Sequence, residues 1–163
     1  MANHGITLTT QISNKTTDGY ATPELLLDII DEEFIAETYE WKNEACIEYI
    51  DSEFNKSFGI CDVKKIVTNK LIKLEFECND TQNELIVGSS QEILVFNSKD
   101  KASFIKASEI VPGEWLCDKE KNKNAFVTNV SNVTETTELY QITARDGEDK
   151  IALVLQTDLV IKI

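Results

Sequence analysis

The sequence has little of what most catalytic and metal sites require. His4 is the only histidine, and the four cysteines, Cys46, Cys61, Cys78 and Cys117, never form a C-x-x-C pair. A zinc site needs closely spaced thiolates or imidazoles, and phosphate binding by a Gly-rich loop needs a motif that is missing here. We therefore expect no metal and no cofactor. We expect the cysteines to be buried thiols in a reducing cytosol, with disulfides as the alternative.

Long apolar runs and targeting signals are also missing. No stretch approaches the ~20 apolar residues that a membrane-spanning helix needs. The first ten residues, MANHGITLTT, lack the basic and apolar regions of a signal peptide. We therefore expect a protein that is cytoplasmic at synthesis, in the cytoplasm of a host or in a virion if its origin is a phage, and that does not bind membranes.

Basic residues are scarce. Sixteen Lys and Arg stand against 29 Asp and Glu, which gives a formal net charge of −13 and a pI near 4.5. Such a chain repels phosphate backbones, so we expect no nucleic-acid partner. The acidic surface serves solubility or meets a basic protein. Arg145 is the only arginine, while Lys, Asn and Ile are abundant, a bias typical of AT-rich genomes such as those of many phages.

What the sequence does contain is apolar material arranged for strands. Hydrophobic residues make up 42% of the 163 positions, enough for the core of one domain spanning residues 1–163. Residues 6–13 alternate and are rich in β-branched side chains, and nearly everything after Ala45 follows the same period of two. We see no internal repeat. The predicted class is mostly β, in one compact domain.

One segment has a helical pattern. In TPELLLDIIDEEFIAETYEW, Thr22 suits an N-cap, Pro23 suits the first helical position, and apolar residues recur at helical spacing. The sequence therefore predicts a single inserted amphipathic helix at about 22–41. Its exposed acidic face is the first candidate surface for a protein partner, and it consists of Asp28, Asp31, Glu32 and Glu37.

A polar corner interrupts the apolar run LIVGSSQEILVF at residues 85–96. The pattern predicts two short strands joined by a tight polar turn, Gly88-Ser89-Ser90-Gln91. Nothing near this corner in the sequence supplies a base for nucleophilic catalysis. His4 is expected to lie in a mobile N-terminus, which argues against a Ser-His-Asp or Cys-His arrangement.

Four segments, taken in order, resemble the Hint domains of hedgehog proteins and inteins. SFIKASEIVPGEWL is similar to a segment that reads roughly W-[VI]-K-A-x-[ED]-[LI]-x-x-G-[DE]-x-[LI], and the long hairpin before it is similar to one that ends in Thr-x-x-His. The first strand and the closing strands also resemble those of the family. The matching residues are Thr10, Ile12, Phe104, Lys106, Ala107, Glu109, Ile110, Gly113, Glu114, Leu116, Tyr140, Ile142, Leu159 and Ile161.

The resemblance implies a horseshoe of curved strands with both chain ends at its centre, and it also implies altered catalytic positions. The nucleophile position of splicing members falls on Gly5, which has no side chain. Their threonine and histidine fall on Gly88 and Gln91, which supply neither a hydroxyl nor a titrating group. Their terminal His-Asn falls on Lys162 and Ile163, so asparagine cyclisation is not available.

We therefore expect a degenerate, catalytically inactive Hint-like domain rather than an enzyme. It would serve as a structural or protein-binding module of phage or mobile-element origin, with a virion-associated role compatible with that origin. One alternative is an intein or mini-intein whose catalytic residues were substituted. Another is an unrelated acidic, β-rich binding or inhibitor protein. The sequence leaves the partner and the oligomeric state open.

Overall fold

The structure is a computed structural model that describes residues 3–7, 10–15, 21–25, 38–40, 46–59, 61–96, 101–144, 149–155 and 158–163. Within these ranges the chain is mostly β, with one turn of 3-10 helix, η2, at Ala107–Glu109. The strands are β1 (Gln11–Lys15), β2 (Ala21–Leu25), β3 (Thr38–Glu40), β4 (Cys46–Asp51), β5 (Lys56–Gly59), β6 (Cys61–Thr68), β7 (Leu71–Cys78), β8 (Thr81–Gly88), β9 (Glu92–Phe96), β10 (Ala102–Lys106), β11 (Trp115–Cys117), β12 (Lys123–Val133), β13 (Thr137–Ala144), β14 (Lys150–Val154) and β15 (Val160–Lys162).

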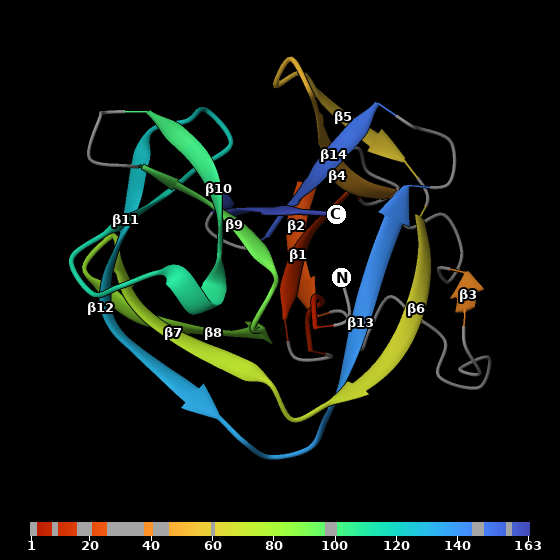
Figure 1. The fold of residues 1–163 in the computed structure, drawn as a ribbon. Coiled ribbons are helices and arrows are strands. Elements are labelled where there is room, and N and C mark those ends of the chain that lie inside the picture. Colours follow the sequence, from red (N-terminus) through yellow and green to blue (C-terminus); the bar gives the residue numbers. More distant parts are fainter. Residues whose placement is uncertain are drawn as a thin grey trace.

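A long, curved, two-stranded ribbon connects the two sides of the molecule (Figure 1). β6 continues into β7 and β12 continues into β13, and the two continuous strands run antiparallel along each other. The register hardly changes where the halves join, because Val133 lies opposite Leu71 and Thr137 lies opposite Thr68. The ribbon curves along the bottom of Figure 1 and gives the domain the horseshoe shape that the resemblance implied.

The C-terminal strands lie inside the main sheet. The strand order is β2-β1-β4-β14-β15-β9-β11-β12-β7-β8, while β13, β6 and β3 form a smaller sheet. The β14–β15 hairpin therefore inserts between β4 and β9, and side chains such as Leu153, Val160 and Ile161 are buried. Both chain ends lie near the centre of the molecule (Figure 1). An apolar strand that runs to the chain end is covered on both edges by its neighbours.

The tip of the β7–β8 hairpin has a two-residue turn. Asn79 and Asp80 have φ values of 51° and 60°, and Cys78 lies opposite Thr81. Two positive φ values in a two-residue loop match a type I′ turn, whose twist suits a tight antiparallel hairpin. This turn sets which backbone groups of β8 face β7 and which face away.

The prediction of a helix at about 22–41 is wrong at both ends of that range, where the structure has strands. Residues 21–25 form β2 and residues 38–40 form β3, while residues 26–37 lie outside the described residues. β2 pairs with β1 over five residues, and Pro23 lies opposite Ser13. β2 is the last strand at this end of the sheet. An edge strand tolerates proline, because the side on which proline lacks an N–H can face away from the neighbouring strand. Strand pairing therefore overrides the local capping signal.

The expected tight turn between β8 and β9 is a corner, because the two strands do not pair with each other. β8 pairs with β7, whereas β9 pairs with β10, β11 and β15. The alternating pattern predicted both strands, but alternation carries no information about which strand lies beside which. The four residues from Gly88 to Gln91 thus turn the chain from one part of the sheet into another.

Two turns with nearly the same sequence have the same geometry. They are DSEFNK, beginning at Asp51, and DKEKNK, beginning at Asp118. In each turn the Asp Oδ1 accepts hydrogen bonds of 2.9–3.0 Å from the backbone N–H groups two and four positions later. The fourth residue has a left-handed φ, 63° at Phe54 and 64° at Lys121. The same local sequence pattern therefore produces the same turn at two places in the chain.

The two turns also contact each other. Lys121 Nζ lies 4.3 Å from the centroid of the Phe54 ring, and Lys56 forms an ion pair with Glu120. These contacts join the β4–β5 hairpin to the β11–β12 hairpin, which come from different parts of the chain. The twin turns thereby connect two hairpins of the main sheet at its surface.

A buried carboxylate lies close to the second turn. Glu48 is 3% exposed, and its carboxylate accepts hydrogen bonds from Ser13 Oγ at 2.8 Å and from Lys119 Nζ at 3.0 Å. Lys119 Nζ also lies 3.7 Å from Asp158. Burial opposes the charge of Lys119, yet the hydrogen bond with Glu48 and the nearby carboxylates leave its pKa raised. The charge of Glu48 is therefore compensated.

We expect Asp51→Ala to lower the free energy of unfolding by about 1 kcal/mol, because two backbone N–H groups lose their acceptor. Urea unfolding followed by tryptophan fluorescence measures the change. Asp149→Ala is the matched control at an exposed turn residue and should leave stability within about 0.5 kcal/mol of the parent. Equal losses in both variants would contradict the structural role of the twin turns.

Candidate functional site

The polar corner lies where the two ends of the chain meet, and the Gln91 side chain connects them. Gln91 is 2% exposed. Its Oε1 accepts a hydrogen bond of 2.9 Å from the Gly5 N–H, and its Nε2 donates to the Lys162 carbonyl at 2.7 Å and to the Glu92 carbonyl at 3.1 Å. One buried amide therefore uses its acceptor and both donors, as a buried amide must.

The backbone around Gln91 holds its side chain in this position. The Gln91 N–H donates to the Gly88 carbonyl at 3.0 Å, and its carbonyl accepts from the Ala107 N–H at 2.8 Å. Immediately afterwards β9 pairs with β15 through Ile93 and Ile161. This pairing brings the neighbouring carbonyl of β15 within reach of the Gln91 amide.

Gly88 lies directly beneath the N-terminal segment. Its N–H donates to the Gly5 carbonyl at 3.2 Å, and the next residue but one, Ser90, donates its N–H to the Asn3 carbonyl at 2.9 Å. A Cβ atom at Gly88 would lie 2.1 Å from the Asn3 carbonyl oxygen, a distance that no real contact allows. No side chain, hydroxyl-bearing or otherwise, fits at this position while the N-terminal segment crosses it.

Gly5 is equally restricted. It is buried, its φ is +137°, and a Cβ atom there would lie 3.0 Å from the Tyr140 carbonyl oxygen. L-amino acids rarely adopt this φ, so a side chain at Gly5 would strain the backbone. The next residue, Ile6, exchanges two backbone hydrogen bonds of 3.1 and 2.8 Å with Tyr140, which fixes the segment on β13.

Lys162 and Ile163 complete the corner from the other end of the chain. Lys162 contributes its carbonyl, while its exposed ammonium lies 3.4 Å from Glu92 Oε2. The Ile163 N–H donates to the Ile151 carbonyl at 2.9 Å, and its side chain packs against the core. A cavity of about 10 Å³ remains between the two ends, about the minimum that holds one water molecule.

Two further polar residues hold the N-terminal segment, and sequence reasoning missed both of them. Thr68 Oγ1 donates to Asn3 Oδ1 at 2.8 Å. Gln141 Nε2 lies 3.2 Å from His4 Nδ1 and donates to the His4 carbonyl at 3.1 Å. The expectation of a mobile N-terminus is therefore wrong for residues 3–7. Thr68 and Gln141 look in the sequence like ordinary polar positions of alternating strands, so no local signal pointed to them.

The corner has little capacity for acid–base or nucleophilic chemistry. The Gln91 amide does not titrate, and the buried Ser90 hydroxyl has no hydrogen-bond partner among the described residues, so no base activates it. The thiols of Cys78 and Cys117 are buried, as expected for these two. Burial, helped by the Asp118 charge, raises the pKa of Cys117 to about 11, which keeps it protonated near neutral pH.

Other site classes are not seen in the described part of the chain. Its residues contain no cluster of three or more His, Cys, Asp or Glu side chains that could hold a metal ion. They also contain no helix long and apolar enough to span a membrane. The acidic residues Asp28, Asp31, Glu32 and Glu37 lie outside the described residues.

The fold is similar to solved intein structures over nearly the whole chain. An intein from a hyperthermophile superposes with a TM-score of 0.70 at 13% identity, covering 98% of this chain and 99% of that chain. The Pab PolII intein has a TM-score of 0.70 at 16% identity, covering 97% and 100%. A bacterial intein-like domain from Clostridium thermocellum has a TM-score of 0.65 at 12% identity, covering 100% of both.

No protein-family profile and no curated protein matches the sequence. The similarity to inteins therefore lies in the fold. The likeness extends over the curved ribbon, the inserted C-terminal hairpin and the meeting chain ends, because these matches cover 97% or more of this chain. More particularly, the chain has the intein-like Hint fold, which confirms the fold expected from the sequence.

We expect Gly88→Ala to lower the free energy of unfolding by about 1–3 kcal/mol, because the new methyl group must displace the Asn3 carbonyl. Thermal unfolding measures the loss, and the NMR signal of the Ser90 amide should shift as its hydrogen bond breaks. Gly59→Ala is the matched control. Its Cβ would meet the flexible end of Lys150 at 3.2 Å and the Tyr49 ring at an ordinary contact distance of 3.7 Å, so its stability should change by less than about 0.5 kcal/mol.

We expect Gln91→Glu to destabilise the protein by about 2 kcal/mol at pH 7, because a carboxylate cannot donate to the Lys162 carbonyl. Burial beside carbonyl oxygens raises the pKa of the new carboxyl in the folded state, so the folded state binds more protons than the unfolded state. Stability should therefore be recovered as the pH falls towards the unfolded value of about 4.3 and be lost again as the pH rises.

Urea unfolding of the parent and of this variant between pH 4 and pH 8 measures the difference. Gln82→Glu is the matched control, because Gln82 is exposed and its side chain reaches only Thr128, at 2.9 Å. Its stability relative to the parent should stay nearly constant over the same range. A flat profile for Gln91→Glu would contradict the buried amide bridge.

Proposed function

We propose that this chain is a catalytically inactive, intein-like Hint domain that serves as a structural or protein-binding module. The observation that carries the proposal is the Gln91 amide, which bonds the Gly5 N–H and the Lys162 carbonyl. The sequence resemblance places the histidine of splicing Hint domains at this position. A neutral amide can hold two chain ends together, but it cannot transfer a proton between them.

The neighbouring positions support the same proposal. Acyl transfer at the first peptide bond needs a side-chain nucleophile, and Gly5 has none. Gly88 offers no hydroxyl to polarise that bond, and Ile163 offers no amide that could cyclise and release the C-terminal end. Gly5 and Gly88 let neighbouring backbones approach closely, and Ile163 packs against the core. The corner is therefore suited to a structural role.

We further propose that the partner is another protein and that the source is a phage or other mobile element, with a virion-associated role. The net charge of −13 disfavours nucleic acid. The single arginine among abundant lysine supports an AT-rich genome. A domain of this composition, made in the host cytoplasm, would contribute a stable scaffold and an acidic contact surface.

The test fuses the chain between two reporter domains and follows the intact mass over time, with and without a thiol and with and without hydroxylamine. We expect the precursor mass to stay unchanged in every condition, because no thioester or ester forms. The same reporters joined by an active mini-intein are the positive control and should be spliced.

A spliced or cleaved product from the chain itself would overturn the proposal. It would show that a nucleophile works from a position other than Gly5. Mass mapping of the trapped hydroxylamine adduct would locate the bond that breaks, and single Ser substitutions of Cys78 and Cys117 would show whether either thiol takes part.

A further inference from the structure

β8 is the last strand at one end of the main sheet. It is eight residues long and pairs with β7 along its whole length. On its other side, among the described residues, it is bridged only near its end, where Val87 lies opposite Ile6 and the Gly88 N–H donates to the Gly5 carbonyl. The earlier part of this edge, at residues 82–85, is therefore open to another strand as far as the described residues reach, while Ile86 already lies opposite Thr7 in the register of this bridge.

The turn of the β7–β8 hairpin decides which groups this edge offers. Hydrogen-bonded and non-hydrogen-bonded pairs alternate along an antiparallel ladder, starting from the bonded pair that closes the two-residue turn, Cys78 and Thr81. Every second residue of β8 therefore directs its backbone N–H and carbonyl away from β7. These residues are Gln82, Glu84, Ile86 and Gly88, and the outward bond of Gly88 agrees with this assignment.

A cavity of about 230 Å³ lies along this open edge. Residues 83–86 of β8 line it together with Thr7 and Thr10 from the N-terminal segment. Buried apolar side chains line its inner end, namely Phe76, Leu155 and Leu159. This volume suits one or two apolar side chains rather than a whole small-molecule ligand, since drug-sized sites start at about 300 Å³.

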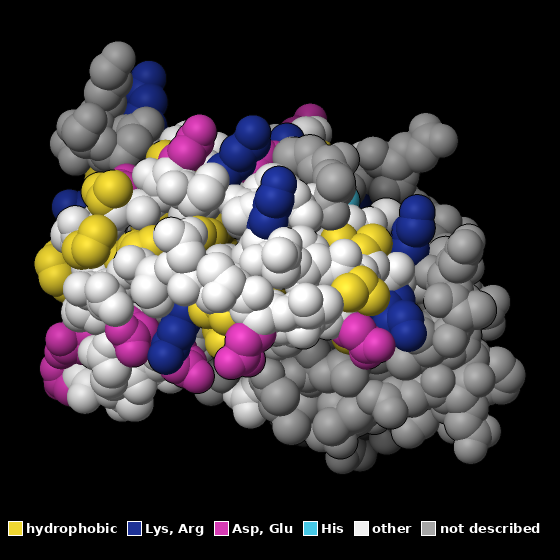
Figure 2. All heavy atoms as spheres, turned by 60° about the horizontal axis from the view of Figure 1, so that its bottom comes forward, with side chains coloured by type: hydrophobic (Ala, Val, Ile, Leu, Met, Phe, Trp, Pro, Cys, Tyr) yellow, Lys and Arg dark blue, Asp and Glu magenta, His cyan; other side chains and the backbone are white. Residues whose placement is uncertain are grey.

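The outer face of the same edge has an excess of negative charge. Lys73 Nζ lies 3.1 Å from Glu84 Oε2 and 3.7 Å from Glu75 Oε1, so one ammonium group serves two carboxylates. Figure 2 shows acidic side chains along the lower border of one face of the molecule, with basic side chains elsewhere on that face. A basic side chain reaching this edge would therefore be attracted.

We infer that the open edge of β8 is a docking site for an extended segment of a partner protein in which Lys or Arg alternates with Val, Ile or Leu. This inference rests on the proposed binding-module function. The segment adds a strand beside residues 82–85, because the outward N–H and carbonyl groups of Gln82 and Glu84 match the ladder of an added strand. Since successive side chains of a strand alternate, apolar ones enter the cavity while basic ones meet Glu84 and Glu75.

The probe is the peptide acetyl-KVKIKVK-amide, titrated into the labelled full chain and followed by NMR and calorimetry. We expect amide shifts to concentrate at residues 82–86, Thr7 and Thr10, with binding weakened by added salt. Two control peptides separate the causes. Methylation of alternate backbone nitrogens on the pairing edge should weaken binding at least about tenfold, and the acidic analogue acetyl-EVEIEVE-amide should bind at least about tenfold more weakly.

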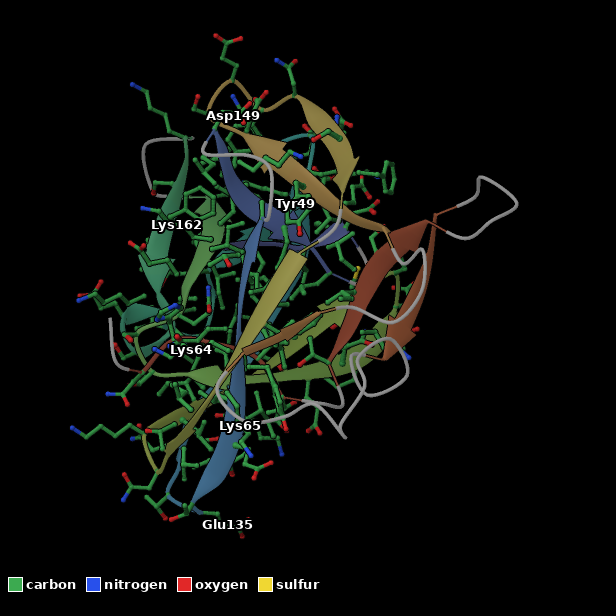
Figure 3. All side chains as sticks on the ribbon, turned by 90° about the vertical axis from the view of Figure 1, so that its right-hand side faces the viewer. Tyr49, Lys64, Lys65, Glu135, Asp149 and Lys162 are labelled. Carbon is green, nitrogen blue, oxygen red and sulfur yellow. The ribbon has the colours of Figure 1, made fainter. Side chains whose placement is uncertain are left out.

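Glu84→Lys should weaken binding of the basic peptide at least about tenfold, and Glu135→Lys is its matched control. Both residues are exposed, so both variants should fold, which thermal unfolding verifies. Figure 3 shows Glu135 at the outer end of the β12–β13 ribbon, away from the core. Glu135→Lys should change the affinity by less than about twofold, because its charge lies far from the added strand.

Several results would overturn the inference. These are no binding at about 1 mM peptide, equal binding of the methylated peptide, or equal weakening by the two charge reversals. Concentration-dependent dimerisation that protects the β8 amides without peptide would identify a second copy as the occupant instead. The intact mass of each sample distinguishes failure of this inference from failure of the proposed function. If the chain stays unprocessed but does not bind the peptide, only the docking site is contradicted. If the chain is spliced or cleaved, the proposed function is contradicted.

Discussion

The buried Gln91 amide is the interaction on which the centre of this fold depends. Two chain ends that meet inside a protein bring backbone N–H and carbonyl groups away from water, and each such group costs free energy if it stays unpaired. The Gln91 side chain pairs the Gly5 N–H with its oxygen and the Lys162 carbonyl with its nitrogen. Because these bonds lie at the start of β9, the inserted β14–β15 hairpin and the N-terminal segment are both secured from one position.

Close approach of backbones explains the rest of the corner. Gly88 lets the Asn3 carbonyl pass where a side chain would otherwise stand, and Gly5 adopts a φ of +137° against Tyr140. A nucleophile at Gly5 or Gly88 would need a side chain. A hydroxyl or thiol would need a Cβ atom, and a Cβ atom has no room at Gly88 in this arrangement. The geometry that closes the corner is thus the same geometry on which the proposed inactivity rests.

The surface features lie apart from this centre. The twin turns at Asp51 and Asp118 join two hairpins through contacts between Phe54 and Lys121, and their charged residues are largely solvated. The open edge of β8 combines backbone groups, an apolar cavity and surplus carboxylates in one place. A domain whose chain ends are secured internally can present such an edge rigidly, which lowers the conformational cost of binding an extended segment.

Local pattern by itself determined the strand-rich class, the hairpin rhythm and, through resemblance, the intein-like fold. That Gly5, Gly88 and Gln91 are altered catalytic positions stays a prediction. Period-two alternation reports which side of a strand is buried, so it succeeds wherever one face meets the core. Only the tertiary structure decided which strands pair, and this overturned the capping signal of Thr22 and Pro23 and the expected β8–β9 turn. It also decided the long-range bonds of Gln91, because hydrogen bonds that join residues 71 and 86 positions apart leave no trace in local sequence.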